Sequence, residues 1–336
     1  MREDKAKTTR KNYISSAFAF TDWCLKNGLT MGDRLPVPTP ATLVFHAAWR
    51  AGRGNSPGYI RSCLSGISAY FEWHHFPSVL RDGNGNVHRD ISRVLRGISR
   101  LLSRKVKKRL PITIPLLHEI LDAIPLVFPN MHDHDRHAYE CFLTNGVYGL
   151  LRVSEQAAPT TRTMDDDKTA RGWDLKCKEA SYLFNINAAK NDTLRTGFQI
   201  EVHATGGRWC PFATAKQWCA VRKAPPQAPL FQLRDGSNIT RARVSKLLKA
   251  CLMYTGHEEG SYDTHSLRGG GAVSLAAAGF GALVPVMGRW RSDSYLGYLQ
   301  NLTRDNVRDM HQALARLAGD SVRQEHSQVY ADRFDH

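Results

Sequence analysis

The feature that most constrains how this chain can fold is a basic run followed by two prolines, about a third of the way along the sequence. The basic residues are Arg104, Lys105, Lys107, Lys108 and Arg109, and Pro111 and Pro115 follow them. A run of like charges cannot pack into a hydrophobic core, and the prolines stiffen the backbone beyond it. We therefore predict an interdomain linker at residues 104–114 that is suited to contact phosphate groups. A nuclear localisation signal and a merely solvated run are the alternative interpretations.

The residues before this linker have the periodicity of amphipathic helices. Apolar side chains recur at helical spacing in four segments, which are Tyr13, Ala17, Phe20 and Cys24; Leu43, Val44 and Ala47; Ile60, Leu64, Ile67 and Phe71; and Ile91, Val94, Leu95, Ile98 and Leu102. Thr39-Pro40 and Ser56-Pro57 are typical of helix starts, and Asn27-Gly28 is typical of a helix end. We predict a small helical bundle over residues 1–103.

The residues after the linker combine helices with a hairpin. Helical spacing returns in the segments 116–124 and 139–151, and again after Thr240, which is a good N-cap residue. Tyr182–Ile186 and Phe198–Val202 have the length of strands and are separated by a polar turn. The fold class predicted for the whole chain is mainly α with a small antiparallel β-sheet. We place a second domain at residues 115–305 and a final amphipathic helix and tail at residues 306–336.

Composition limits the partners of the chain. Its 336 residues are 42% hydrophobic, enough for a substantial core, and its formal net charge is +15. Such a charge favours a polyanionic partner, because cations that neutralise phosphates release condensed counterions; a basic but solvated surface is the alternative. We see no apolar run that approaches the length of a membrane span and no signal peptide, so we expect no membrane partner.

Metal and disulfide chemistry are not indicated. The seven cysteines are scattered and never have C-x-x-C spacing, which favours buried thiols in a reducing compartment. His132, His134 and His137 follow Pro129 in a polar stretch, and we interpret this stretch as a solvated loop or helix start rather than a metal site. We expect neither a metal nor a cofactor.

Cationic side chains occur at three places in the second domain. Arg152 ends an apolar helix and precedes Glu155 by three residues, so its partner is either Glu155 or the phosphate of a ligand. Lys190 lies in the turn of the predicted hairpin. His265 and Arg268 share one face of a helix. The body of that helix, residues 270–278, is small enough for another backbone, from a helix or from a nucleic acid, to approach closely.

The segment after this helix adds a hydroxyl group. Gly288-Arg289-Trp290 is followed by Tyr295 and Tyr298. Attack on a phosphodiester without a metal requires cations, a proton acceptor and a hydroxyl nucleophile, and these residues together supply all three.

The order of these residues resembles the catalytic set of the tyrosine recombinases, the integrase-type enzymes that exchange DNA strands. The matching residues are Arg152, Lys190, His265, Arg268, Trp290 and Tyr298. The local sequences at residues 150–155, 189–192, 265–269 and 288–293 are most similar to recombinases of eukaryotic crypton and DIRS-type mobile elements. The resemblance implies a helical core-binding domain followed by a tyrosine-recombinase catalytic domain.

The resemblance also implies roles for these residues. Tyr298 would attack the scissile phosphate to give a 3′-phosphotyrosyl link, while Arg152 and Arg268 bind the non-bridging oxygens. Lys190 would protonate the leaving 5′-oxygen. Many family members have histidine in place of Trp290, and an indole N–H can donate a hydrogen bond but cannot shuttle a proton, so His265 would carry the base role. Tyr295 is expected to pack.

Double-stranded DNA is the expected partner. The predicted DNA-binding residues are Arg104, Lys105, Lys107, Lys108, Arg109, Arg241 and Arg243, and basic helices are expected at residues 93–104 and 241–249. The C-terminal helix would dock on a neighbouring protomer, so a homo-oligomer, a dimer or a tetramer on DNA, is expected. The expected location is the nucleus in a eukaryote and otherwise the cytoplasm or nucleoid. A type IB topoisomerase-like relaxing enzyme and a catalytically silent DNA-binding protein are the alternative functions.

Overall fold

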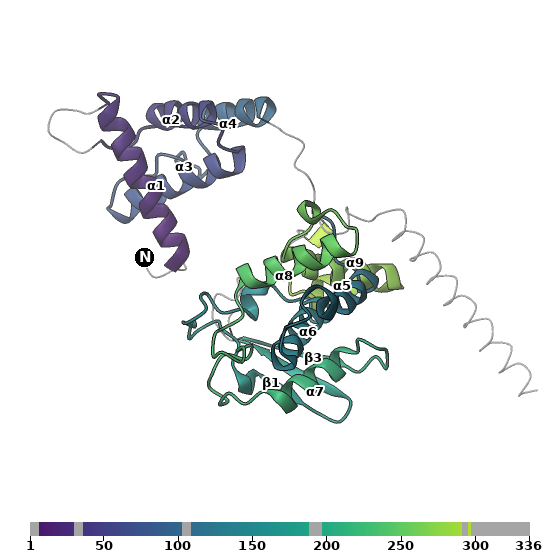
Figure 1. The fold of residues 1–336 in the computed structure, drawn as a ribbon. Helices are drawn as coiled ribbons and strands as arrows, with labels where there is room; N and C mark the ends of the chain where they lie inside the picture. The colour runs from purple at the N-terminus through teal and green to yellow at the C-terminus, as the bar shows by residue number, and fades with distance from the viewer. Residues whose placement is uncertain (1–6, 30–35, 103–108, 188–196, 291–294, 297–336) are drawn as a thin grey trace, which may run out of the picture. The chain divides into compact units, whose positions relative to one another are not determined.

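The computed structural model describes residues 7–29, 36–102, 109–187, 197–290 and 295–296 (Figure 1). The chain divides into two compact units, Met1–Val106 and Lys107–His336. The boundary between the units falls within the basic run. Of the basic residues in that run, Arg104, Lys105, Lys107 and Lys108 lie outside the described residues.

The first unit contains four helices, α1 (Lys7–Lys26), α2 (Pro40–Gly52), α3 (Pro57–Trp73) and α4 (Arg89–Leu101). Helix α1 packs against α3, and α2 packs against α4. Their core is formed by the apolar side chains at the predicted helical spacing, which include Phe20, Leu43, Ile60, Leu64, Ile67 and Ile91. The predicted helices are therefore confirmed.

Local capping explains where these helices begin and end. The Thr39 side chain accepts a hydrogen bond from the N–H of Thr42, and the Thr42 hydroxyl in turn accepts one from the N–H of Thr39. The Ser56 side chain caps α3 by accepting a hydrogen bond from the N–H of Tyr59. Gly28, with φ +65°, adopts the left-handed conformation that ends α1.

The second unit combines helices with a short sheet, which packs against α7 (Pro211–Val221). Its helices are α5 (Ile114–Val127), α6 (Asp133–Tyr148), α7 (Pro211–Val221), α8 (Arg241–Tyr254), α9 (His265–Leu275) and α10 (Val284–Met287). Helix α6 packs against α7 and α9, and α5 packs against α8. Every residue of α6 from Ala138 to Val147 is buried, so α6 forms the centre of this core.

The sheet is antiparallel, with the order β1 (Leu175–Cys177), β2 (Ser181–Ile186), β3 (Phe198–His203). Tyr182 pairs with Val202, and Phe184 pairs with Ile200. The hairpin of β2 and β3 and the mainly α class with a small sheet are confirmed. Strand β1 was not predicted, because three residues are too few to show an alternating pattern.

One boundary of α6 agrees with the sequence analysis and the other does not. Helix α6 begins at Asp133, within the stretch interpreted as a solvated loop or helix start, and His132 caps it: its ring Nδ1 accepts a hydrogen bond from the N–H of His134 at 3.1 Å. Helix α6 ends at Tyr148, so Arg152 does not lie at the end of a helix as predicted. Among the described residues, no group of three or more His, Cys, Asp or Glu side chains could hold a metal ion.

The small residues of α9 contact protein backbone. A Cβ atom on Gly270 would lie 1.7 Å from the carbonyl oxygen of Ile112, and one on Gly271 would lie 2.1 Å from that of Val147. The last part of the predicted linker is held there, because the N–H of Ile112 donates a 2.9 Å hydrogen bond to the carbonyl of Ser266. The sequence allowed the backbone of either a helix or a nucleic acid to approach this helix closely. In the structure, protein backbone approaches it, at Ile112 and at Val147.

The expectation that no apolar run approaches a membrane span is wrong. The segment His265–Met287, 23 residues long, is apolar enough and long enough to cross a membrane by length and composition. It does not form one straight helix, since Gly279 has φ +89° and interrupts the helical backbone. It also carries Arg268, whose side chain is buried within the protein fold.

Candidate active site

Arg152 lies just beyond a strained turn. Leu150 adopts the left-handed conformation at φ +47°, which is costly for a residue with a side chain. Arg152 then precedes a short 3-10 helix at Val153–Glu155. The Glu155 carboxylate accepts hydrogen bonds from the backbone N–H of Arg152 and from its guanidinium Nη1, both at 2.8 Å. The ion pair expected from the sequence therefore forms, and the Arg152 side chain remains 16% exposed.

Arg268 is buried under the same turn. Its side chain is 1% exposed, and its guanidinium donates to the carbonyl oxygen of Leu150 at 2.6 Å and to that of Gly288. The guanidinium also lies over the ring of Trp290, 4.2 Å from its centroid. Arg268 is therefore held in one orientation by groups that are distant in sequence.

Glu155 is the shared partner of three arginines. Its side chain is 2% exposed, and besides Arg152 it accepts a hydrogen bond from Nη2 of Arg289 at 3.1 Å. Nη1 of Arg268 lies 3.9 Å from the same carboxylate. One carboxylate among three guanidinium groups leaves an excess of positive charge, which suits a phosphate. From the sequence, no role was assigned to Arg289. The only signal that could have identified it is its position between Gly288 and Trp290 in the Gly-Arg-Trp motif.

His265 lies at the exposed start of α9. Its backbone N–H donates to Oδ1 of Asp263 at 2.7 Å. Partial desolvation of the ring, and then the charges of nearby Arg241, Arg109, Arg152 and Arg268, lower its pKa below the ordinary value. The structure thus brings His265 within electrostatic range of Arg152 and Arg268, and it favours the neutral imidazole that can accept a proton.

Trp290 joins the arginine cluster to a small apolar cluster. Its ring and that of Tyr295 pack, with centroids 6.2 Å apart, against the buried Leu150, Ala272 and Val284. Gly288 allows this arrangement, because a Cβ atom there would overlap the indole at 1.5 Å. Of the six predicted catalytic residues, Lys190 and Tyr298 lie outside the described residues.

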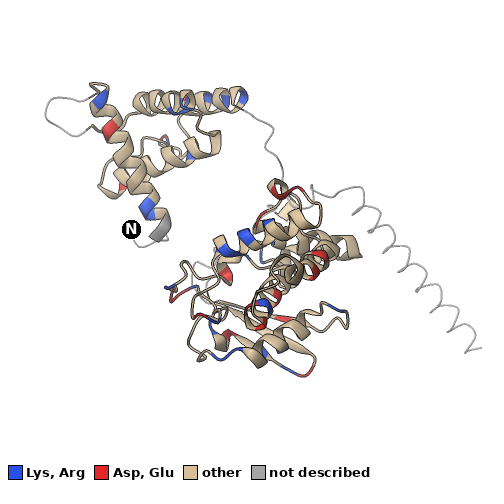
Figure 2. Ribbon diagram, viewed as in Figure 1, with Lys and Arg blue, Asp and Glu red and all other residues tan. Residues whose placement is uncertain are grey.

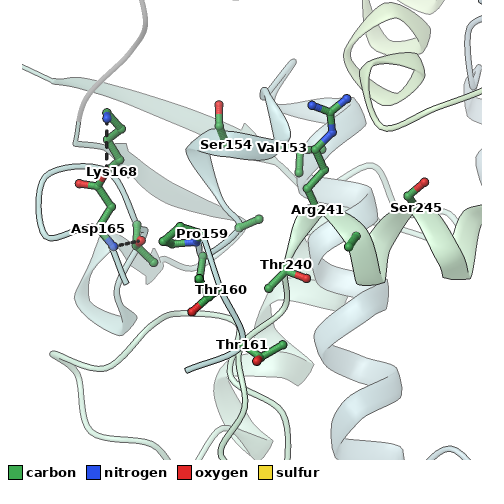
Figure 3. Close-up of a pocket in the computed structure, with 14 residues that line it drawn as sticks. Val153, Ser154, Pro159, Thr160, Thr161, Asp165, Lys168, Thr240, Arg241 and Ser245 are labelled. Carbon is green, nitrogen blue, oxygen red and sulfur yellow. Dashed lines mark hydrogen bonds and ion pairs between the residues drawn. The ribbon is translucent and has the colours of Figure 1, made fainter. Parts of the chain in front are cut away.

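An open groove of about 710 Å³ begins beside the arginine cluster, at the residues that follow Arg152 (Figure 3). Val153 and Ser154, which follow Arg152 in the chain, and Arg241 and Ser245 of α8 are among its lining residues. Arg241 is 63% exposed and lies 3.9 Å from Asp263, which also pairs with Arg109. Lys and Arg side chains recur along α8, and along α4 in the first unit (Figure 2).

The two predicted DNA-binding arginines of α8 differ in their surroundings. Nη1 of Arg243 donates to the hydroxyl of Ser237 at 2.6 Å and to the carbonyl of Asn238 at 3.3 Å. This guanidinium therefore stabilises the loop before α8, whereas Arg241 faces the groove. Arg109 is exposed at the start of the second unit.

Solved structures share this architecture. The chain matches the XerH site-specific recombinase in a pre-cleavage complex with its difH substrate with a TM-score of 0.56 and 17% identity, over 86% of this chain and 76% of that one. It also matches residues 75–356 of lambda integrase, as a dimer bound to a COC′ core site, with a TM-score of 0.53 and 13% identity, over 90% and 91% of the two chains. The fold is therefore that of the tyrosine recombinases. At this identity the similarity establishes the fold alone. The chain matches no protein-family model and has no significant match among curated proteins.

Proposed function

We propose that this chain is a site-specific DNA recombinase that cuts and rejoins strands through a covalent 3′-phosphotyrosyl intermediate. The observation that carries the proposal is the convergence of Arg152 with Arg268 and Trp290, which both lie more than 100 residues later in the chain, beside His265. The fold shared with XerH and lambda integrase supports it.

In this proposal the arginines stabilise the charge that develops on the scissile phosphate. Arg152 is partly exposed, and Glu155 is the only described residue that accepts a hydrogen bond from its guanidinium, through Nη1. Its other N–H groups can bind a non-bridging oxygen. Arg268, on the buried side of Glu155, contributes its charge from a fixed orientation in a low-dielectric setting.

Proton transfer is assigned to His265 and Lys190. Tyr298 attacks the phosphorus, and its phenolic proton passes to the neutral ring of His265; Lys190 protonates the 5′-oxygen that leaves. The phosphotyrosyl bond keeps the energy of the broken phosphodiester, so a 5′-hydroxyl can later attack it and rejoin the strand. Trp290 orients Arg268 through its ring and does not move protons.

Double-stranded DNA is the proposed substrate, bound through the groove beside Ser154 and Arg241 and through the basic segment 104–109. We propose residues 1–103 as the core-binding domain, 104–114 as the linker, 115–305 as the catalytic domain and 306–336 as the segment that docks on a neighbouring protomer. We further propose that the chain acts as a dimer or tetramer on DNA. Its proposed source is a mobile element of the crypton or DIRS type, and its proposed location in a eukaryote is the nucleus.

A nicked duplex tests the chemistry. Cleavage next to a nick releases a short fragment and traps the protein on DNA, so the adduct can be seen by denaturing electrophoresis. We expect an adduct with the natural chain, none with Tyr298→Phe, and an adduct with the matched control Tyr295→Phe. An adduct that survives in Tyr298→Phe but disappears in Tyr295→Phe would move the nucleophile to Tyr295.

The same preparation separates the alternatives. Relaxation of supercoiled DNA of any sequence by protein monomers, without exchange of strands between duplexes, would favour a type IB topoisomerase. DNA binding without any adduct would favour a catalytically silent DNA-binding protein. Sequencing of the DNA ends attached to the trapped protein would identify the target site.

A further inference from the structure

The most unusual side chain in the site is that of Arg289. Its backbone has φ +58°, in the left-handed region that favours glycine and is strained for residues with a side chain. Its side chain is only 7% exposed. A long charged residue at such a position needs contacts that compensate for the burial of its charge and for the strain of its backbone.

Three of its four hydrogen-bond partners lie in the segment 149–155, which carries Arg152. Nη2 of Arg289 donates to Glu155 at 3.1 Å and to the carbonyl of Leu150 at 3.2 Å. Nη1 donates to the carbonyls of Met287 at 3.1 Å and, at 3.4 Å, of Gly149. Its Nε is buried without a hydrogen-bond partner among the described residues. Arg289 therefore ties the carboxylate to the turn and contributes little surface to the solvent.

The hydrogen bonds that Glu155 accepts determine which N–H groups of Arg152 remain available to a ligand. Arg152 uses its Nη1 on Oε1 of Glu155, while Oε2 is taken by Arg289 and by the backbone N–H of Arg152. A carboxylate released from Arg289 would be free to form the two-pronged pair that arginine favours. Arg152 would then turn its remaining N–H groups toward Glu155 and away from a phosphate.

We propose that Arg289 is a positioning residue that holds and neutralises Glu155, so that Arg152 remains available to the scissile phosphate. This inference rests on the proposed function. It assigns Arg289 no contact with DNA and no proton transfer. The loss of Arg289 should slow cleavage while DNA affinity changes little.

Two single substitutions separate the side chain from the backbone. Arg289→Met removes the charge and keeps the length, and Arg289→Gly removes the side chain but fits the positive φ without strain. We expect both to slow adduct formation on a saturating nicked substrate by about 10- to 100-fold, with the dissociation constant for DNA within about twofold of the natural chain. Wild-type cleavage rates in both variants would overturn the inference.

A double-mutant cycle tests the route through Glu155. In a Glu155→Gln background there is no charged carboxylate to capture Arg152, so Arg289→Met should slow cleavage by less than about threefold. An equal loss in both backgrounds would show that Arg289 acts independently of Glu155 and would overturn the inference. Arg289→Lys should keep part of the rate, because it retains the charge but not the forked geometry.

A measurement without DNA separates failure of this inference from failure of the proposed function. Inorganic sulfate is the probe, and the midpoint of urea unfolding is compared in sulfate and in chloride at equal ionic strength. We expect sulfate to stabilise the natural chain more than Arg152→Met, with Arg289→Met resembling Arg152→Met. A sulfate effect in Arg289→Met as large as in the natural chain, or no difference for Arg152→Met, would overturn the inference. If the natural chain formed no adduct on any DNA, the proposed function would fail and this comparison would still decide the role of Arg289.

Discussion

Nη1 of Arg268 donates a 2.6 Å hydrogen bond to the carbonyl oxygen of Leu150, 118 residues earlier in the chain. That carbonyl points to the guanidinium because Leu150 takes the left-handed conformation. The same carbonyl accepts a hydrogen bond from Arg289. One strained turn thus orients two cations of the site.

The buried position of Arg268 makes it important for stability as well as for cleavage. Arg268→Met would leave the carbonyl of Gly288 without its donor, remove one of the two donors to the carbonyl of Leu150, and remove one cation from Glu155. We expect the free energy of unfolding to fall by about 3–5 kcal/mol, measured by urea denaturation. The control is Arg241→Met, because Arg241 is 63% exposed and its loss should change stability by less than about 0.5 kcal/mol. Similar stabilities for both variants would contradict the packing described for Arg268.

The close approach at Gly270 predicts a large effect from a single methyl group. Gly270→Ala would drive a Cβ atom into the carbonyl of Ile112, and the backbone on both sides has little room to move. We expect a loss of about 3 kcal/mol or more in the free energy of unfolding. Gly97→Ala is the matched control within a helix, since nothing lies within 4 Å of its Cβ atom, and it should stabilise by about 0.5–1 kcal/mol. A harmless Gly270→Ala would show that α9 does not contact Ile112.

The lowered pKa of His265 predicts where the rate falls in acid. Desolvation and the surrounding arginines disfavour the charged ring, so the neutral base persists below the ordinary histidine pKa of about 6.5. The second-order rate constant for adduct formation should therefore begin to fall only below about pH 6.5. The free energy of unfolding changes in the same direction. Because the pKa of His265 is lower in the folded chain than in the unfolded chain, the unfolded chain takes up the proton first, and the stability associated with the neutral ring is lost as pH falls below about 6.5. An acid limb above that pH, or one unchanged in His265→Gln, would exclude the base role.

Cys177 is expected to be the most reactive thiol among the described cysteines. A hydrogen bond with Cys219, opposed by burial and assisted by Lys216, lowers the pKa of Cys177 to about 7, and its sulfur is exposed and 3.8 Å from that of Cys219. Alkylation by iodoacetamide at neutral pH, followed by peptide mass spectrometry, should label Cys177 well before Cys141, whose pKa is raised by burial.

The substitution Cys219→Ala provides the control for this prediction. It removes the hydrogen bond that stabilises the thiolate, so Cys177 should react more slowly in this variant. Equal labelling rates of Cys177 and the buried Cys141 in the natural chain would contradict the exposure and the pKa described here.

Much of the secondary structure could be predicted because the signals are local. Thr39, Ser56 and Thr240 accept hydrogen bonds from N–H groups within three residues, so the sequence alone contains both partners. The same holds for the β2 and β3 hairpin, whose alternating residues pair across one turn. The end of α6 was missed because the break at Leu150 depends on contacts with Arg268 and Arg289, far along the chain.

The sequence by itself determined the helix starts, the apolar faces and the residue types of the site, because these depend on neighbours within a few positions. Only the tertiary structure decided which groups meet. It placed Arg268 and Arg289 beside the carboxylate with which Arg152 pairs locally, placed the backbone of Ile112 against Gly270, and buried Arg268 against the segment of Leu150. These contacts join segments more than 100 residues apart, and such pairings arise from the packing of whole helices, which local sequence patterns do not encode.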